Sequence, residues 1–161
     1  MLRHRIPGLS DDNATTTISI LQDRLAAYND LSLTLKHVHW NVIGPNFIAV
    51  HEMLDPQIDL VRGYADEAAE RIAALGGAPL GTVAAITAPI PYHLATAGTQ
   101  AHLRELDDVY CQVIAANRHA IDTLGDLDPV SQDLVIGATG ELEKFQWFVR
   151  AHLEFPMELP F

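Results

Sequence analysis

The chain has 161 residues, of which 48% are hydrophobic and 19% are charged, a composition that suits one domain with a sizeable core. Its net charge is −11 and its ten lysines and arginines are scattered, which disfavours a DNA-binding protein that relies on a basic patch. No run of about 18 apolar residues exists, so no transmembrane helix is expected, and no secretion signal is recognisable. The single cysteine, Cys111, fits a reducing cytoplasm, and its apolar neighbours predict a small buried side chain instead of a reactive thiol.

Apolar residues recur at steps of three and four along most of the chain, which predicts long amphipathic helices. An extended, flexible tail over residues 1–14 precedes the first helix, which runs from about Thr15 to a turn at 44–46. The second helix is expected from Phe47 to about residue 75. It contains Pro56, which should remove one backbone hydrogen bond and bend the helix locally.

Residues 76–96 form a crossover that is too long for a structureless loop, so a short helix is expected within it. Two further helices are predicted over about 99–124 and 129–153, followed by a short C-terminal tail over 155–161. No strand pattern is present. The domain over 15–154 is therefore predicted to be all-α, a ferritin-like four-helix bundle with a short extra helix in the crossover between helices two and three.

Five residues of the types that bind first-row metal ions cluster near the first turn and along the second helix: His39, His51, Asp55, Asp66 and Glu70. At 100° per residue, the four on the second helix form one continuous stripe. Asp55 and Asp66 are nevertheless roughly 16 Å apart along the axis at 1.5 Å per residue. One metal ion cannot bridge that gap, so a single chain carries two half-sites.

A two-fold axis between two copies of the chain would unite the half-sites. An antiparallel pairing that places His51 opposite Glu70 also places Asp55 opposite Asp66, because both pairs are centred between residues 60 and 61. Such isologous pairing is the commonest way in which chains associate. His39 lies one short turn before the second helix and can lean over His51. The hypothesis is two metal sites per dimer, each built across the interface.

Two imidazoles with carboxylates suit Fe(II) or Zn(II), and several carboxylates with room for water favour iron redox chemistry over a closed zinc site. A single histidine or aspartate on such a helix is usually solvated or hydrogen-bonded in the core. Five that satisfy one symmetry relation are harder to dismiss. The stretch His51-Glu52-Met53-Leu54-Asp55 distantly resembles a zinc-protease helix, but an aspartate replaces the second histidine, which argues against a protease.

The sequence resembles the DNA-binding protein from starved cells (Dps) branch of the ferritin superfamily, the actinobacterial members above all. The resemblance covers about residues 15–154. It rests on four motifs: Lys36-His37-Val38-His39-Trp40-Asn41-Val42-Ile43-Gly44-Pro45-Asn46-Phe47, then His51 to Asp55, then Asp66-Glu67-Ala68-Ala69-Glu70-Arg71, and Leu142-Glu143-Lys144-Phe145-Gln146-Trp147-Phe148.

This resemblance implies a hollow cytoplasmic dodecamer with ferroxidase sites at its two-fold interfaces. His39, His51 and Asp55 would come from one subunit, and Asp66 and Glu70 from its dyad partner. Members of the family oxidise Fe(II), typically with hydrogen peroxide and otherwise with O₂, and store the ferric product inside the shell. Zn(II) is a substitute for iron at such sites.

Two further roles are implied by the resemblance, each with an ordinary alternative. Trp40, beside His39, is either a sacrificial electron donor near the site or an aromatic residue that packs in the interface. Asp126, Asp128 and Asp133 are the candidates for an acidic iron-entry pore on the three-fold axes. The alternative for Asp126 and Asp128 is helix capping.

DNA binding is the point at which the sequence departs from the family pattern. Members that condense DNA commonly use termini rich in lysine and arginine. Here Arg3, His4 and Arg5 stand against Asp11 and Asp12, so DNA binding is expected to be weak or salt-sensitive, even with avidity over twelve copies. The competing interpretations are a nucleoid-associated, DNA-compacting protein with a secondary metal site, and a dimeric helical binding module without redox function.

Overall fold

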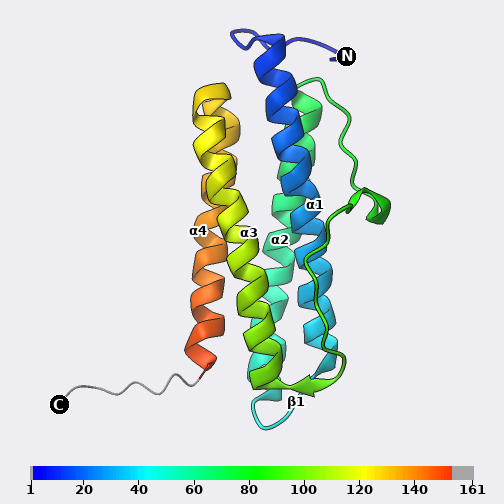
Figure 1. Ribbon diagram of the computed structural model, residues 1–161, viewed down its shortest axis with the longest axis vertical. Helices are drawn as coiled ribbons and strands as arrows, with labels where there is room; N and C mark the ends of the chain where they lie inside the picture. Colours follow the sequence, from blue (N-terminus) through cyan, green and yellow to red (C-terminus); the bar gives the residue numbers. More distant parts are fainter. Residues whose placement is uncertain (1, 154–161) are drawn as a thin grey trace, which may run out of the picture.

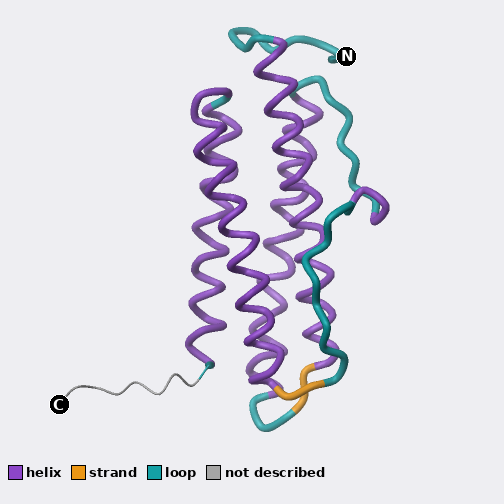
Figure 2. The backbone as a smooth tube through the Cα atoms, in the orientation of Figure 1, coloured by secondary structure: helices purple, strands orange, loops and turns teal. Residues whose placement is uncertain are grey.

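The computed structural model describes residues 2–153, and four long helices account for most of them (Figures 1 and 2). They are α1 (Asp11–Asn41), α2 (Phe47–Ala74), α3 (Thr99–Leu127) and α4 (Pro129–His152). Short turns join α1 to α2 and α3 to α4, whereas the crossover from α2 to α3 runs along the length of the bundle. The predicted all-α four-helix bundle is confirmed. No helix in this part of the chain is long and apolar enough to cross a membrane.

The crossover contains one turn of 3-10 helix, η1 (Val83–Ala85), where a short helix is expected from the sequence. It ends in β2 (Ala97–Gly98), which pairs in parallel with β1 (Val42–Ile43) at the end of α1. The sequence shows no strand pattern for this ladder, because two residues are too few to show any alternation. The ladder ties the last turn of α1 to the first turn of α3.

Apolar side chains from all four helices fill the core, as the spacing of three and four residues predicts. Its most completely buried members include Leu35, Val38, Leu54, Val61, Leu106, Tyr110, Leu142 and Val149. The core also holds Asn117, whose side-chain oxygen accepts hydrogen bonds from the Tyr28 hydroxyl at 3.3 Å and from Arg24 at 3.1 Å. α2 continues as one helix through Pro56.

α1 begins at Asp11, earlier than the predicted start at Thr15. Ser10 is the reason, because its hydroxyl accepts a hydrogen bond from the amide of Asn13 at 3.1 Å and so caps the helix. Before this cap, the backbone N–H of Arg3 donates to the carbonyl of Gly76 at 2.8 Å, just past the end of α2. The flexibility of the N-terminal tail stays a prediction.

We predict that Gly76→Ala destabilises the fold more than Gly8→Ala does. Both glycines have positive φ, +87° for Gly76 and +81° for Gly8, and an alanine at either position costs about 1–3 kcal/mol of unfolding free energy. A Cβ at Gly76 would also lie 2.6 Å from the backbone oxygen of His4, whereas one at Gly8 meets nothing within 4 Å. Thermal and chemical denaturation measure both variants. Equal losses of unfolding free energy would show that the clash between the added Cβ and the backbone oxygen of His4 costs nothing.

Candidate metal centre

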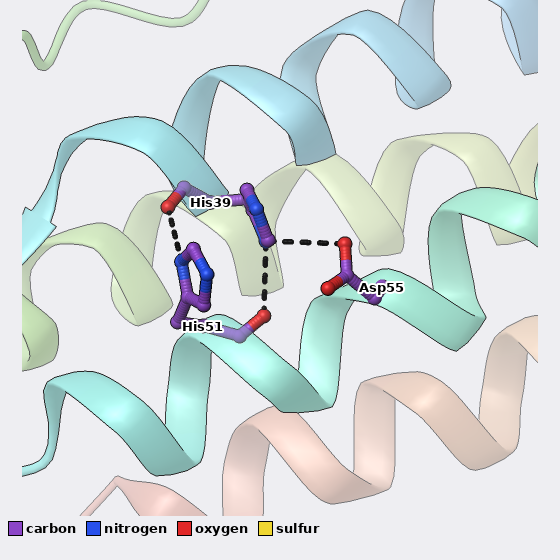
Figure 3. Close-up of side chains that lie close together, drawn as sticks. All are labelled: His39, His51 and Asp55. Atoms are coloured by element: carbon purple, nitrogen blue, oxygen red, sulfur yellow. Dashed lines mark hydrogen bonds and ion pairs between the residues drawn. The ribbon is translucent and has the colours of Figure 1, made fainter.

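Three side chains able to bind a metal ion meet where α1 ends and α2 begins. His39 lies in the last turn of α1, while His51 and Asp55 lie one turn apart in α2. One ligand atom from each lies within 4.8 Å of the others (Figure 3). Within residues 2–153 no other group of three histidine, cysteine or carboxylate side chains meets this condition. These three are among the five ligands predicted from the sequence.

Reciprocal hydrogen bonds between the two histidines set the orientation of both rings. Nδ1 of His51 lies 2.8 Å from the carbonyl oxygen of His39, and Nδ1 of His39 lies 3.0 Å from that of His51 (Figure 3). A carbonyl oxygen only accepts, so Nδ1 of each ring carries the hydrogen and Nε2 keeps its lone pair. The rings stack with centroids 3.6 Å apart. Metal-binding histidines commonly have their other nitrogen held in this way.

The third ligand, Asp55, is half-exposed and ionised. Its Oδ1 lies 3.1 Å from Nζ of Lys36 and 3.3 Å from Nδ1 of His39. The hydrogen bond from Lys36, together with the nearby His39 and His51, holds the pKa of Asp55 below its usual value. Oδ2 takes part in neither contact. The three residues thus offer two imidazole nitrogens and one carboxylate oxygen to a cation.

Asp66 and Glu70, the other two predicted ligands, do not join this group. Both lie further along α2 and are exposed. Their separation from Asp55 along one continuous helix keeps them out of reach of the same ion, as expected for a chain with two half-sites. Whether a second chain brings them to His39, His51 and Asp55 stays a prediction.

Large apolar side chains are exposed close to the half-site in the sequence. Trp40, next to His39, is 71% exposed, Ile48 in the first turn of α2 is 58% exposed, and Leu60 is 40% exposed. Leu60 is one of the two residues between which the predicted dyad passes. Apolar side chains left in water favour burial against a partner. Neither of the two roles considered for Trp40 is decided by its exposure.

The three pore candidates differ in their surroundings. Asp126 and Asp133 are exposed, whereas Asp128 is buried at the start of α4. The carboxylate of Asp128 accepts a hydrogen bond from Arg71 at 2.7 Å and one from the Ser131 hydroxyl at 2.5 Å. Burial opposes the charge, but these hydrogen bonds outweigh it and keep the pKa of Asp128 below its usual value. Asp128 therefore joins α2 to the start of α4, and an acidic pore at Asp126, Asp128 and Asp133 stays a prediction.

Cys111 is exposed on α3, so the prediction that it is buried was wrong. Its Sγ lies 3.0 Å from Nε2 of Gln146 and 3.2 Å from Nη2 of Arg150, both on α4. The neighbours Tyr110 and Val113 face the core, and their apolar character misled the interpretation of the intervening position.

Sequence reasoning also missed Lys36, which holds Asp55, and the two backbone carbonyls that orient the histidines. Lys36 stands one turn before His39, so its position on the same side of α1 could have been noticed. The carbonyl contacts depend on how closely α1 and α2 approach, for which the sequence carries no signal.

Comparison with known proteins places these features in a family context. The Ferritin model, described as a ferritin-like domain, matches residues 18–156. The DNA protection during starvation protein of Mycolicibacterium smegmatis is 60% identical over 157 residues, covering 96% of this chain and 86% of the relative. A solved structure of Mycobacterium smegmatis Dps superposes with a TM-score of 0.93 at 60% identity, covering 96% of each chain. DpsA14 from Streptomyces coelicolor gives a TM-score of 0.90 at 51% identity and covers 96% of this chain and 95% of its own.

We predict that Asp128→Ala destabilises the protein by about 3–5 kcal/mol, because it leaves the guanidinium of Arg71 without its buried partner. Asp126→Ala, at an exposed position, should change the free energy of unfolding by about 0.5 kcal/mol or less. Denaturant titrations of both variants give the comparison.

The ion pair between Asp128 and Arg71 also predicts how the stability of the protein depends on pH. The pKa of Asp128 is lower in the folded protein than the ordinary value of 3.8, so its contribution is present above that value and lost as the pH falls through the folded pKa. The stability difference between wild type and Asp128→Ala should therefore shrink in acid. A difference independent of pH would contradict this assignment.

Proposed function

This chain belongs to the ferritin-like family, and within it to the Dps proteins; on that premise we propose that it is a ferroxidase and iron-storage protein. It oxidises Fe(II), preferably with hydrogen peroxide, and stores the ferric product in a dodecameric cage, which protects the cell against oxidative damage. The observation that carries this proposal is the group of His39, His51 and Asp55, with both Nδ1 atoms engaged by carbonyls.

The donor set suits Fe(II) as a substrate. Two imidazole nitrogens and a carboxylate form the ligand type that binds Fe(II) while leaving positions for other ligands. Zn(II) accepts the same donors, so we expect it to compete with iron at the same place. Because Lys36 and His39 contact only Oδ1 of Asp55, the other oxygen is the one offered to the ion.

The site is completed by a second copy of the chain in this proposal. Asp66 and Glu70 of the partner supply carboxylates opposite His51 and Asp55, in the antiparallel register centred between Leu60 and Val61. The exposed apolar side chains of Trp40, Ile48 and Leu60 support burial of this region against a partner. A chain alone offers three ligands, and the paired chains offer five.

Two Fe(II) ions and one molecule of hydrogen peroxide balance the reaction. Each Fe(II) gives one electron, the O–O bond breaks, and two protons convert its oxygens into two water molecules. When both electrons are delivered together at one site, no hydroxyl radical is released. The carboxylates of Asp55 and of the partner's half-site stabilise the higher charge of Fe(III).

We predict that His51→Ala and Asp66→Ala each abolish most of the rapid, peroxide-dependent oxidation of Fe(II), and that a mixture regains about a quarter of the wild-type rate. The fraction follows from isologous pairing: half of the randomly exchanged dimers are mixed, and one of the two sites in each is intact. Stopped-flow absorbance measures the rate. Glu52→Ala, next to His51 but outside the ligand group, is the matched control and should retain activity.

Subunit exchange in the mixture must be verified by mass spectrometry of the assemblies. Complete exchange without recovery of activity would rule out a site shared between two chains. Loss of activity in Glu52→Ala as well would show that the substitutions act on folding instead of on the ligands.

DNA compaction is the second candidate function, favoured by the name of the relative from Mycolicibacterium smegmatis. Charge argues against it. Six of the ten lysines and arginines form ion pairs with carboxylates within residues 2–153, among them Arg5, which lies 2.9 Å from Asp11. Few cations remain to replace the counterions of DNA.

We predict weak binding of duplex DNA that is lost at physiological salt, because few phosphates are contacted. Gel shifts over a salt series measure it. The N-terminal charges should be removed as Arg3→Ala and Arg5→Ala, since truncation of residues 1–14 would also remove Ser10 and the first turn of α1. Tight binding at physiological salt that depends on these arginines would make DNA compaction the leading function.

A further inference from the structure

A tyrosine and a buried histidine form a hydrogen-bonded pair outside the metal half-site. The hydroxyl of Tyr92, in the crossover, lies 2.6 Å from Nδ1 of His102, in the first turns of α3. His102 is fully buried, and its Nε2 has no hydrogen-bond partner in the described part of the chain. The contact is short and joins a phenol to a base.

The protonation states of the pair follow from its surroundings. Burial lowers the pKa of His102, so its ring is neutral near pH 7 and offers one nitrogen lone pair. Burial, helped by the nearby Glu105, raises the pKa of Tyr92, so the phenol keeps its proton. The hydroxyl therefore donates and Nδ1 accepts.

The pair lies beside the same turn of α1 that carries the metal ligand His39. The ring of His37 meets Tyr92 edge-on with centroids 5.7 Å apart, and Nε2 of His37 hydrogen-bonds the carbonyl of Leu94 at 2.7 Å. In Figure 1 the end of the crossover lies against the lower end of α1, next to β1. His37 and His39 are two residues apart in α1 and therefore point to nearly opposite sides of the helix, so α1 lies between Tyr92 and the half-site.

We propose that Tyr92 is an electron donor that reduces strong one-electron oxidants formed at the iron site, while His102 takes the phenolic proton. The source of the oxidant rests on the proposed function. When one Fe(II) alone meets hydrogen peroxide, it becomes Fe(III) and releases hydroxide and a hydroxyl radical. Tyr92 gives that radical one electron, which makes a second hydroxide. The O–H proton moves to Nδ1 of His102, leaving a neutral tyrosyl radical and an imidazolium.

The other three tyrosines lack this arrangement. Tyr28 and Tyr110 donate to the side-chain amide oxygens of Asn117 and Gln57, which are not bases at neutral pH. The hydroxyl of Tyr64 has no hydrogen bond to any residue in the described part of the chain. Loss of an electron makes a phenol strongly acidic, so a base already in place favours oxidation of Tyr92 over the others.

The test traps radicals by rapid freezing and detects them by electron paramagnetic resonance (EPR) in two experiments on the assembled protein. One uses a photogenerated oxidant, ruthenium tris-bipyridine with persulfate, and needs no iron. The other uses Fe(II) below one ion per chain, with hydrogen peroxide. Wild type should give a tyrosyl signal in both, Tyr92→Phe should lose it, and Tyr64→Phe, the matched control, should keep it.

High-field EPR distinguishes a redox role of His102 from a purely structural one, because the spectrum reports whether the tyrosyl radical is hydrogen-bonded. His102→Asn removes the base, so any remaining tyrosyl signal should show in high-field EPR the larger gx value of a radical without a hydrogen bond. An unchanged signal in Tyr92→Phe, or no tyrosyl signal in wild type with the photogenerated oxidant, would overturn the proposal. The proposal would also be overturned if the tyrosyl signal appeared with the photogenerated oxidant but not with Fe(II) and hydrogen peroxide, although Fe(II) was oxidised. If Fe(II) oxidation itself fails, the proposed function fails, and the photochemical experiment still decides the chemistry of the pair.

Discussion

The pair of hydrogen bonds between His39 and His51 is the contact on which the metal half-site depends. The carbonyl of His39 is among the last four of α1, which lack regular partners within the helix, and His51 supplies a donor to it. The reverse bond holds the ring of His39 against α2. One interaction therefore ends α1, sets the approach of α2 and frees a nitrogen on each ring. A substitution of either histidine removes a candidate ligand and a helix–helix contact together.

The helices could be predicted because their signals are local. The starts of α2 and α3, at Phe47 and Thr99, follow from the turn residues Gly44-Pro45 and from the end of a stretch rich in glycine and proline. The start of α1 was missed because the polar residues after Ser10 have the composition of a tail, although Ser10 is itself a good capping residue. The ladder between β1 and β2 had no local signal at all.

Three of the five candidate ligands, His39, His51 and Asp55, lie together as the sequence predicts, but their surroundings could not be predicted. Lys36 reaches Asp55, and Arg71 reaches Asp128, across distances in the chain that only the packed helices close. The burial of Asp128 turns a candidate for an acidic channel into a structural ion pair. The predicted partnership of Asp66 and Glu70 with the other three residues would involve two chains, so one chain alone does not display it.

Electrostatics favour a small cation over a polyanion as the partner of this chain. The net charge is −11, and most of the cations are already neutralised by carboxylates of the same chain. An assembly multiplies that excess, because each added chain brings the same sign. The resulting field would raise the local concentration of Fe(II) and lower that of DNA phosphates, as the proposed function requires. Under the proposed function, a single Fe(II) that meets peroxide would form a hydroxyl radical, and the hydrogen-bonded pair of Tyr92 and His102 would supply the electron that this radical takes up.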